Sequence, residues 1–453
     1  MKQYPSYEST TIPWNPTMPA HWKEYRGKRL FFSKKVKNAG NEESNILSLT
    51  LKGVIRNDKD RPIGLSPDDY STYQIFEQGD LVFKLIDLEN ISTSRVGIVP
   101  ERGIMSSAYI RLTARSPLNI RYFYMQYYSL WLRNIYNGLG AGVRQTLSAD
   151  ELLNLGIVVP PAAEQDQIVR FLDWKVSKVN QLINIKRKEI KAIDAMKRSV
   201  VSSAVTRGLD SSTPMKFSGV KWLGDIPAHW QTIKLRQILH PVSIKNHPEL
   251  PLLSVVREQG VIVRDVTDKE ANHNYIPDDL SGYKVVKKGQ FAMNKMKAWQ
   301  GSYGISDYTG IVSPAYFIFD VSFENLEYFH YAIRSKVYVN FFAQASDGIR
   351  VGQWDLQMDK MKEIPFIVPP ADEQVAIVEY IKRTLPQYDV AIEKLSAEVE
   401  TLEEYKTKLI DDVVTGKIDV RDVEIPEYEF VDEDADADSD SDDDSDDTEE
   451  QEE

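Results

Sequence analysis

Two twelve-residue stretches of this chain are nearly the same, although they lie 209 positions apart. Residues 158–169 read VVPPAAEQDQIV and residues 367–378 read IVPPADEQVAIV, with eight of the twelve letters identical. Upstream of them, MPAHW at 18–22 returns as IPAHW at 226–230. This period is far longer than the roughly 20–50 residues of a solenoid unit. The repeat therefore predicts a duplicated module of domain size.

Each module begins with a globular part in which strands and helices are mixed. Residues 46–112 and 250–320 contain short β-branched and aromatic stretches separated by Gly and Pro, a pattern typical of strands. An aromatic-rich helix is expected after each of them, at 119–136 and 325–344. Aromatic side chains at helical spacing more often belong to a core than to a ligand platform. The predicted fold class is α+β.

A long helix is expected to follow each globular part. Apolar residues recur there at steps of three and four that average near 3.5, the coiled-coil period. A helix of ~40 residues with one narrow apolar seam needs a partner, so the two helices are predicted to pair as an antiparallel coiled coil. Lys186 interrupts the first seam, and Pro386 is expected to kink or restart the second helix. The seam positions are Ile168, Leu172, Val176, Val179, Leu182, Lys186, Ile190, Ile193, Met196, Val200 and Ala204, then Ile377, Ile381, Leu385, Tyr388, Ile392, Leu395, Val399, Leu402, Tyr405, Leu409 and Val413.

The predicted domain order is therefore globular, helical, globular, helical and tail. The first globular module is expected at 1–160 and its helix at 161–208. The second module is expected at 209–369, its helix at 370–420 and an acidic tail at 421–453.

The net charge of −13 is concentrated at the C-terminal end of the chain. Residues 427–453 contain 17 Asp or Glu and no Lys or Arg, so the rest of the chain carries about +4. Runs of Asp and Ser cannot bury enough apolar surface to fold, so the tail is predicted to be disordered. The mildly basic body is compatible with a nucleic-acid partner.

Composition also limits the compartment and the chemistry of the chain. The absence of Cys excludes disulfides, thiolate metal sites and cysteine nucleophiles. No apolar run approaches the roughly 18 residues of a membrane span, and the first residues lack a signal-peptide core. A cytoplasmic chain without a membrane partner is expected.

The motifs of a catalytic or metal site are largely missing. The six His show no HExxH spacing, and no phosphate-binding G-x-x-x-x-G-K-[ST] loop occurs. His21 and His229, in the repeated PAHW, are expected to be hydrogen-bonded structural residues. Acid pairs at 68–69 and 278–279 could start a nuclease metal site, but Asp after Pro is common in turns. The chain is predicted to be non-catalytic, with no cofactor and no metal.

Basic and amide side chains gather in the loops between predicted strands. Arg and Lys neutralise phosphates or bond guanine, while Gln and Asn bond adenine in the major groove. Any one of them alone is more simply a solvated charge; their occurrence in the same loops of both modules favours DNA binding. The candidate DNA-binding residues are Lys84, Arg95, Arg144 and Gln145 in the first module, and Lys295, Lys297, Trp299, Gln300, Arg350 and Gln353 in the second.

Four stretches together resemble the specificity subunit of type I restriction–modification systems. They are WLGDIPAHW at 222–230, GQFAMNKMKAWQGSYGISDYTGIVSPAY at 289–316, both PPxxEQxxIV junctions and VVTGKID at 413–419. The likeness covers residues 15–420. No NKMKAWQ occurs near Phe83, so the first module departs further from the family pattern, and the acidic tail lies outside the likeness.

The resemblance implies two target recognition domains, each reading one half of a bipartite sequence in double-stranded DNA. It implies that two long helices separate these domains and dock two adenine-methyltransferase (M) subunits, with motor-nuclease (R) subunits joining the complex. It also implies that the chain itself is not catalytic. Three alternatives remain: a sequence-reading subunit of another methylation-linked defence system, a self-contained site-specific nuclease, and a coiled-coil scaffold that does not bind DNA.

Overall fold

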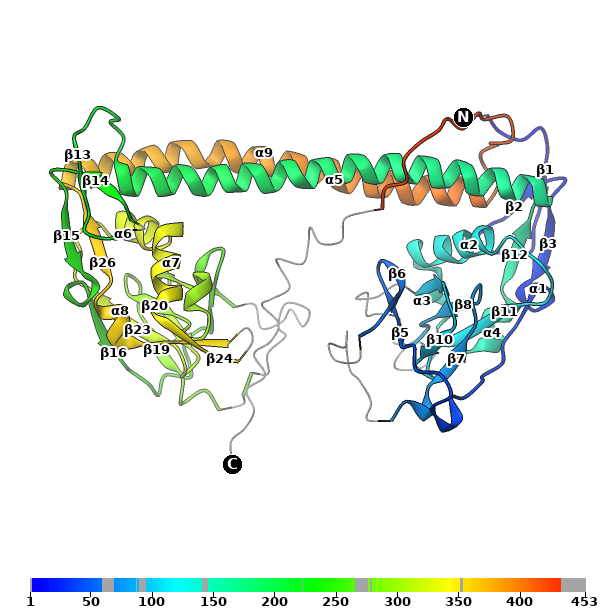
Figure 1. The fold of residues 1–453 in the computed structure, drawn as a ribbon, viewed down its shortest axis with the longest axis horizontal. Coiled ribbons are helices and arrows are strands. Elements are labelled where there is room, and N and C mark those ends of the chain that lie inside the picture. The colour runs from blue at the N-terminus through cyan, green and yellow to red at the C-terminus, as the bar shows by residue number, and fades with distance from the viewer. Residues whose placement is uncertain are drawn as a thin grey trace. The chain divides into compact units, whose positions relative to one another are not determined.

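The computed structural model describes two compact units (Figure 1). The described residues are 2–58, 69–86, 88, 95–140, 146–221, 223–264, 276–277, 279–350 and 353–432, without the side chains of 349, 350 and 353. Among these, unit 1 contains the residues up to Lys188 and from Ser396 onward, and unit 2 contains those from Glu189 to Leu395.

Unit 1 is built on a four-stranded antiparallel sheet, and further strands of the unit form separate pairs. The strands of unit 1 are β1 (Tyr7–Ser9), β2 (Thr17–Pro19), β3 (Lys23–Arg26), β4 (Phe31–Phe32), β5 (Leu47–Thr50), β6 (Gly53–Arg56), β7 (Gln74–Phe76), β8 (Leu81–Phe83), β9 (Val96–Ile98), β10 (Gly103–Met105), β11 (Ile110–Ala114) and β12 (Gly156–Val159). Its short helices are α1 (Gly27–Leu30), η1 (Ala39–Asn41), η2 (Tyr70–Thr72), α2 (Ile120–Leu132), α3 (Ile135–Leu139) and α4 (Ala149–Asn154). The central order is β4-β11-β8-β9, and the other strands pair as β1-β2, β3-β12, β5-β6 and β7-β10.

Unit 2 has a central sheet with the same connections. Its strands are β13 (Met215–Phe217), β14 (Asp225–Pro227), β15 (Gln231–Lys234), β16 (Leu239–Val242), β17 (Leu253–Val256), β18 (Gly260–Val263), β19 (Lys284–Val286), β20 (Phe291–Met293), β21 (Tyr303–Ile305), β22 (Gly310–Val312), β23 (Phe317–Val321), β24 (Ser346–Arg350), β25 (Gln353–Leu356) and β26 (Pro365–Val368). Its short helices are η3 (Leu235–Gln237), η4 (Ala298–Gln300), α6 (Leu326–Ile333), α7 (Lys336–Gln344) and α8 (Met358–Lys362). The order is β16-β23-β20-β21, with pairs β13-β14, β15-β26, β17-β18, β19-β22 and β24-β25. The predicted mixed α+β class is confirmed for both units.

The aromatic segments each form two helices where the sequence predicted one. Asn134 adopts the left-handed conformation with φ 54° and separates α2 from α3. In unit 2, the extended backbone of Ser335 separates α6 from α7. The aromatic side chains are core, as predicted: Tyr122 and Tyr328 are fully buried, and burial raises the pKa of both phenols.

The two long helices are α5 (Ala162–Arg207) and α9 (Ala371–Val414), and each contributes part of its length to each unit. In unit 1, Lys186 pairs with Glu398 at 3.0 Å and Arg187 pairs with Glu403 at 2.8 Å. Lys186, the polar residue in the apolar seam of α5, thus has an acidic partner on α9.

No helix of the described residues is long and apolar enough to cross a membrane.

The helix predictions need three corrections. The second helix ends at Val414 rather than 420, and it continues through Pro386 without a restart. Predicted seam residues Leu182, Met196 and Tyr405 are exposed by 48%, 57% and 45%, whereas Ile183 is fully buried. A strict 3.5 spacing drifts around a helix of 3.6 residues per turn, so neighbouring positions take over the buried face.

The repeated motifs of the sequence meet at the start of each long helix. In unit 1, the carboxylate of Glu164, in the PPxxEQ stretch, accepts hydrogen bonds from Trp22 Nε1 at 3.0 Å and Tyr4 Oη at 2.5 Å, and it lies 2.8 Å from His21 Nε2. In unit 2, Glu373 accepts from Trp230 Nε1 at 2.9 Å and contacts His229. The hydrogen-bonded structural role predicted for both His is confirmed.

In each unit, a glycine that follows the end of a long helix packs against the tryptophan of the PAHW motif. Gly416 has φ +78°, and a Cβ there would lie 2.4 Å from Pro19 and 3.1 Å from Trp22. Gly208 has φ +77°, and its Cβ would lie 3.2 Å from Trp230. Each PAHW motif therefore holds the start of one long helix and the end of the other, which explains why PAHW, PPxxEQ and the terminal Gly recur together.

Residues 420–432, here named the C-terminal strap, pack against the N-terminal half of α5 within unit 1. Val420 is fully buried, and Val423 and Ile425 pack against the core of this unit. Side chains of α5 bond the strap backbone: Gln167 to Val420 and Val423, Ser177 to Glu429 and Val431, Asn180 to Val431, and Asn184 to Asp432. The prediction of disorder was therefore wrong for the strap, because its apolar residues find a core and its backbone finds side-chain partners. Residues 433–453 lie outside the described residues.

The strap is expected to stabilise unit 1. A chain that ends at Ile418 should lose at least about 2 kcal/mol of unfolding free energy there, because a fully buried Val contributes about 1.5–3 kcal/mol and each hydrogen bond about 1 kcal/mol. A chain that ends at Asp432 keeps the strap and is the matched control. Urea unfolding followed by hydrogen exchange in both units measures the difference. Equal stability of the two truncated chains would contradict a stabilising strap.

Candidate nucleic-acid interface

The predicted DNA-binding residues of unit 2 come mainly from the connection between β20 and β21. The N–H of Asn294 donates to the carbonyl of Ser302 at 3.0 Å, which ties the two ends of this connection together. It is a short folded loop, and η4 forms part of it. The predicted residues that it carries are Lys295, Lys297, Trp299 and Gln300.

The β24–β25 hairpin packs directly on this loop. The rings of Trp299 and Trp354 are stacked, with centroids 5.4 Å apart and an interplanar angle of 25°. Lys295 Nζ lies 3.2 Å from a carboxylate oxygen of Asp355. Arg350 and Gln353 face each other at the end of the hairpin, although their side chains lie outside the described part of the structure. The structure thus brings the two candidate loops of unit 2 together.

Two further lysines belong to this surface and were missed by the sequence analysis. Lys284 is the first residue of β19, and its backbone bridges that of Lys245. The Lys284 ammonium donates to the carbonyl of Tyr316 at 2.7 Å. Burial lowers the pKa of Lys284, and the nearby charges of Lys245 and Lys295 lower it further. A comparison of the two modules position by position would have found Lys284, because its counterpart is the neutral Gln74.

Unit 1 presents its predicted residues differently. The backbone N–H of Lys84 donates to the carbonyl of Arg95 at 3.0 Å, next to the end of β8. The Arg95 side chain is 1% exposed, and its guanidinium donates to the carbonyl of Ile86 at 3.2 Å. Arg95 is therefore a buried residue that holds the local backbone, which corrects its prediction as a surface contact. Arg144 and Gln145 lie outside the described residues.

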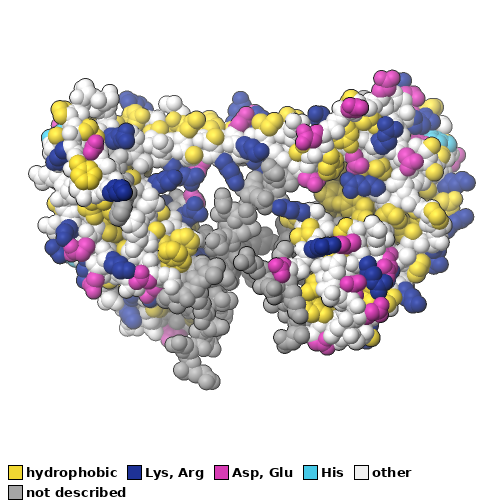
Figure 2. Space-filling view, viewed as in Figure 1, with side chains coloured by type: hydrophobic (Ala, Val, Ile, Leu, Met, Phe, Trp, Pro, Cys, Tyr) yellow, Lys and Arg dark blue, Asp and Glu magenta, His cyan; other side chains and the backbone are white. Residues whose placement is uncertain are grey.

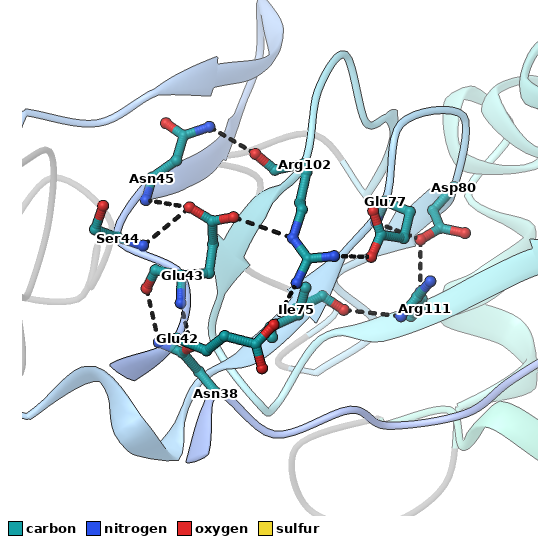
Figure 3. A network of polar contacts seen from close by, with 10 residues as sticks. All are labelled: Asn38, Glu42, Glu43, Ser44, Asn45, Ile75, Glu77, Asp80, Arg102 and Arg111. Atoms are coloured by element: carbon teal, nitrogen blue, oxygen red, sulfur yellow. Dashed lines mark hydrogen bonds and ion pairs between the residues drawn. The ribbon is translucent and has the colours of Figure 1, made fainter. Parts of the chain in front are cut away.

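Arg102 in unit 1 is held by three carboxylates (Figure 3). Its guanidinium contacts Glu42 at 3.0 Å, Glu43 at 3.1 Å and Glu77 at 2.7 Å. Backbone N–H groups of Asn45 and Ser44 also bond Glu43, and these bonds together with Arg102 hold the pKa of that carboxyl below its usual range. The network joins the segment before β5 to the ends of β7 and β10, so Arg102 has a structural role.

A buried ion pair in unit 1, drawn in the same view, has an apolar counterpart in unit 2. Arg111 Nε lies 2.5 Å from Asp80 Oδ2, and both side chains are almost fully buried (Figure 3). Val82 pairs with Arg111 in unit 1, whereas Ala292 pairs with Ile318 at the same register in unit 2. Gln290, in turn, precedes β20 as Asp80 precedes β8. One unit therefore buries a charge where the other buries an apolar side chain.

On the face drawn in Figure 2, Lys and Arg are interspersed with Asp and Glu over both units. No group of His, Asp or Glu among the described residues could hold a metal ion. Asp69 and Asp279, the described members of the candidate acid pairs, accept the backbone N–H of Ser71 and Ser281 and thus serve turns.

Part of this chain matches a known family model. Residues 25–192 match the model described as "Type I restriction modification DNA specificity domain". The matched residues cover the globular part of unit 1 from β3 onward and the first two thirds of α5.

Two curated proteins similar to this chain come from Methanocaldococcus jannaschii. The type I restriction enzyme MjaVIII specificity subunit is 25% identical over 346 residues, which cover 71% of this chain and 76% of the relative. The putative type I restriction enzyme MjaX specificity subunit is 25% identical over 315 residues, which cover 65% and 68%. Both matches extend well beyond a single module.

A solved structure reported under the description "Structural basis underlying complex assembly and conformational transition of the type I R-M system" shares the fold of this chain. The alignment has a TM-score of 0.58 at 12% identity. It covers 88% of this chain and 99% of the other.

Proposed function

We propose that this chain is the non-catalytic subunit that gives a type I restriction–modification complex its DNA sequence specificity. The observation that carries the proposal is the likeness of this chain to the type I specificity-domain model and, along most of their length, to two curated specificity subunits. A self-contained nuclease would need a metal or acid–base site, and the acids considered for one serve turns where they are described.

The two globular modules, 1–160 and 209–369, are proposed to be duplicated target recognition domains. Their central sheets share one connection order, and their strands share register. They differ in the polar residues of the strands and loops, as Arg111 against Ile318 illustrates. Two modules with the same sheet order but different polar side chains are suited to recognise two different DNA half-sites, because individual side chains read base identity.

The long helices are proposed to pair as an antiparallel coiled coil. Within unit 1, Asn180 of α5 contacts Lys406 of α9, and Arg187, further along α5, contacts Glu403, which comes earlier in α9. The two helices therefore run in opposite directions there. Within unit 2, Lys197 of α5 contacts Asp389 of α9. Helices of this kind are proposed to dock two adenine-methyltransferase (M) subunits, and motor-nuclease (R) subunits join the assembly, which acts on double-stranded DNA in the cytoplasm.

Site selection from a randomised duplex library, with the chain and its methyltransferase partner co-expressed, tests this function. Wild type should select a bipartite sequence with a constant spacer. The combined Lys295→Ala, Lys297→Ala and Gln300→Ala variant should relax one half-site only, since each lost bidentate base contact costs about 1–3 kcal/mol.

A charge-matched control is the pair Lys221→Ala and Lys336→Ala, two exposed lysines of unit 2 outside these loops. It should leave both half-sites intact. Equal relaxation of both half-sites by the loop variant would contradict the assignment of these residues to one reader. Recovery of no preferred sequence by wild type would contradict the proposed function itself.

A further inference from the structure

Position 284 of unit 2 and position 74 of unit 1 are structural equivalents. Lys284 begins β19 and pairs with Val312, and its backbone bridges Lys245. Gln74 begins β7 and pairs with Met105, and its backbone bridges Lys37. The two strands therefore have the same neighbours in both units, but one begins with a cation and the other with a neutral amide.

Both side chains make the same hydrogen bond. Lys284 Nζ donates to the carbonyl of Tyr316 at 2.7 Å, and Gln74 Nε2 donates to the carbonyl of Tyr109 at 2.6 Å. Tyr109 and Tyr316 occupy equivalent places in the repeated segments GIMSSAYI and GIVSPAYF. A neutral amide thus satisfies this carbonyl in unit 1, so the fold does not require the positive charge of Lys284.

The charge of Lys284 is unfavourable as it stands. The side chain is half-buried, and no carboxylate among the described residues forms an ion pair with it. Lys245 and Lys295 add two positive charges nearby, and within the described part of the chain only Lys295 of these two has an acidic partner, Asp355. Like charges that are partly removed from water repel each other more strongly than in bulk solvent. An anion placed between these ammonium groups would relieve the repulsion.

We propose that Lys245, Lys284 and Lys295 bind one phosphate group of the DNA backbone, and that unit 1 lacks this contact because Gln74 stands at the equivalent position. The inference rests on the DNA-binding function proposed above. Ammonium groups carried by β19, by the segment that follows β16 and by the β20–β21 loop suit a phosphate group, whose oxygens accept several charge-assisted hydrogen bonds. Since phosphates carry no base identity, the site contributes affinity and register to the unit 2 half-site rather than sequence preference.

The test replaces Lys284 with the residue that unit 1 uses. Lys284→Gln keeps a donor for the carbonyl of Tyr316, so the variant should fold with unchanged stability. Binding of the full complex to its selected duplex is measured from about 50 to 200 mM salt, and the slope of log K against log salt should become shallower by about 0.9, the value of one released phosphate contact. Non-specific duplexes should show the same change, and the selected half-sites should stay the same.

Two further variants sharpen the result. Gln74→Lys introduces the charge into unit 1, and it should steepen the slope by a similar amount. Lys221→Gln removes an exposed charge of unit 2 outside the cluster and should leave the slope unchanged. An unchanged slope for Lys284→Gln, with tight DNA binding retained, would overturn the phosphate site, and so would a change in the selected unit 2 sequence.

Free phosphate is the other source of the same chemistry. If millimolar inorganic phosphate raises the melting temperature of wild type but not of Lys284→Gln while the DNA slope stays the same, the site takes a free anion and the DNA contact is overturned. A wild-type complex that selects no sequence would instead refute the proposed function, and that outcome is recognised before any variant is compared.

Discussion

Alanine in place of Asp80 is expected to lower the unfolding free energy of unit 1 by about 3–5 kcal/mol, the range found when one partner of a buried ion pair is removed. Asp80 Oδ2 lies 2.5 Å from Arg111 Nε and also accepts the backbone N–H of Glu77 at 2.7 Å. Asp80 Oδ1 accepts the hydroxyl of Thr113 at 2.6 Å. Without the carboxylate, the buried Arg111 guanidinium loses its charged partner and keeps, among the described residues, only the Ile75 carbonyl, and the part-buried N–H of Glu77 loses its acceptor.

Unit 2 supplies the matched control for this substitution. Its residues at the same registers are Gln290 and Ile318, and Gln290 accepts the backbone N–H of Lys287 at 2.7 Å as Asp80 accepts that of Glu77. The double variant Asp80→Gln with Arg111→Ile installs this pair in unit 1, and it should remain within about 1.5 kcal/mol of wild type because no buried charge remains. Urea unfolding with hydrogen exchange in each unit measures both variants. A double variant as unstable as Asp80→Ala would show that the ion pair has no neutral substitute here.

Removal of the Glu164 carboxylate is expected to produce the second large loss of stability. Its side chain is 5% exposed and receives Tyr4 Oη and Trp22 Nε1 in addition to its contact with His21. Burial, reinforced by the bond to Glu164, raises the pKa of Tyr4, so the phenol stays protonated and donates at neutral pH. Glu164→Ala should destabilise unit 1 by about 3–5 kcal/mol, because two buried donors lose a charged acceptor and each such loss costs about 1–3 kcal/mol.

The equivalent change in unit 2 is the control. Glu373 is 36% exposed and bonds Trp230 and His229, and no third side chain among the described residues bonds it as Tyr4 bonds Glu164. Water can replace part of what Glu373→Ala removes, so a loss of about 1–2 kcal/mol is expected in unit 2. The two variants are compared by protease resistance and hydrogen exchange at the start of each long helix. Equal losses of stability in the two variants would mean that the deeper burial of Glu164 does not increase its contribution to the stability of unit 1.

Features with a local period were predictable from the sequence. Apolar steps of three and four predicted both long helices, and the starts at Ala162 and Ala371 follow the Pro-Pro pairs as expected. The β-branched stretches predicted the strands of two mixed modules. Helix ends that depend on the backbone conformation of a single residue were not predicted. An example is the end of the first aromatic helix, where Asn134 is left-handed.

The candidate site was less predictable, because the sequence marks a charge but not its partner. Arg95 was expected at the surface and is buried, while Lys284 was overlooked and belongs to a lysine cluster. Lys295 lies in a loop between two strands, as predicted, but its contact with Asp355 joins segments 60 positions apart. Propensity and periodicity carry no information on such pairs.

The sequence by itself determined the period of the repeat, the α+β class of the modules, the starts of the long helices and the likeness to type I specificity subunits, because each depends on residues close together or on letters that recur. The tertiary structure alone decided which charges are buried, which are neutralised and where the chain is fastened. Gln167 holds the strap at Val423, 256 positions away. Such contacts form only when the fold brings distant segments together, and the free energy of a charge or an unpaired backbone group depends on the partners and the burial that it finds there.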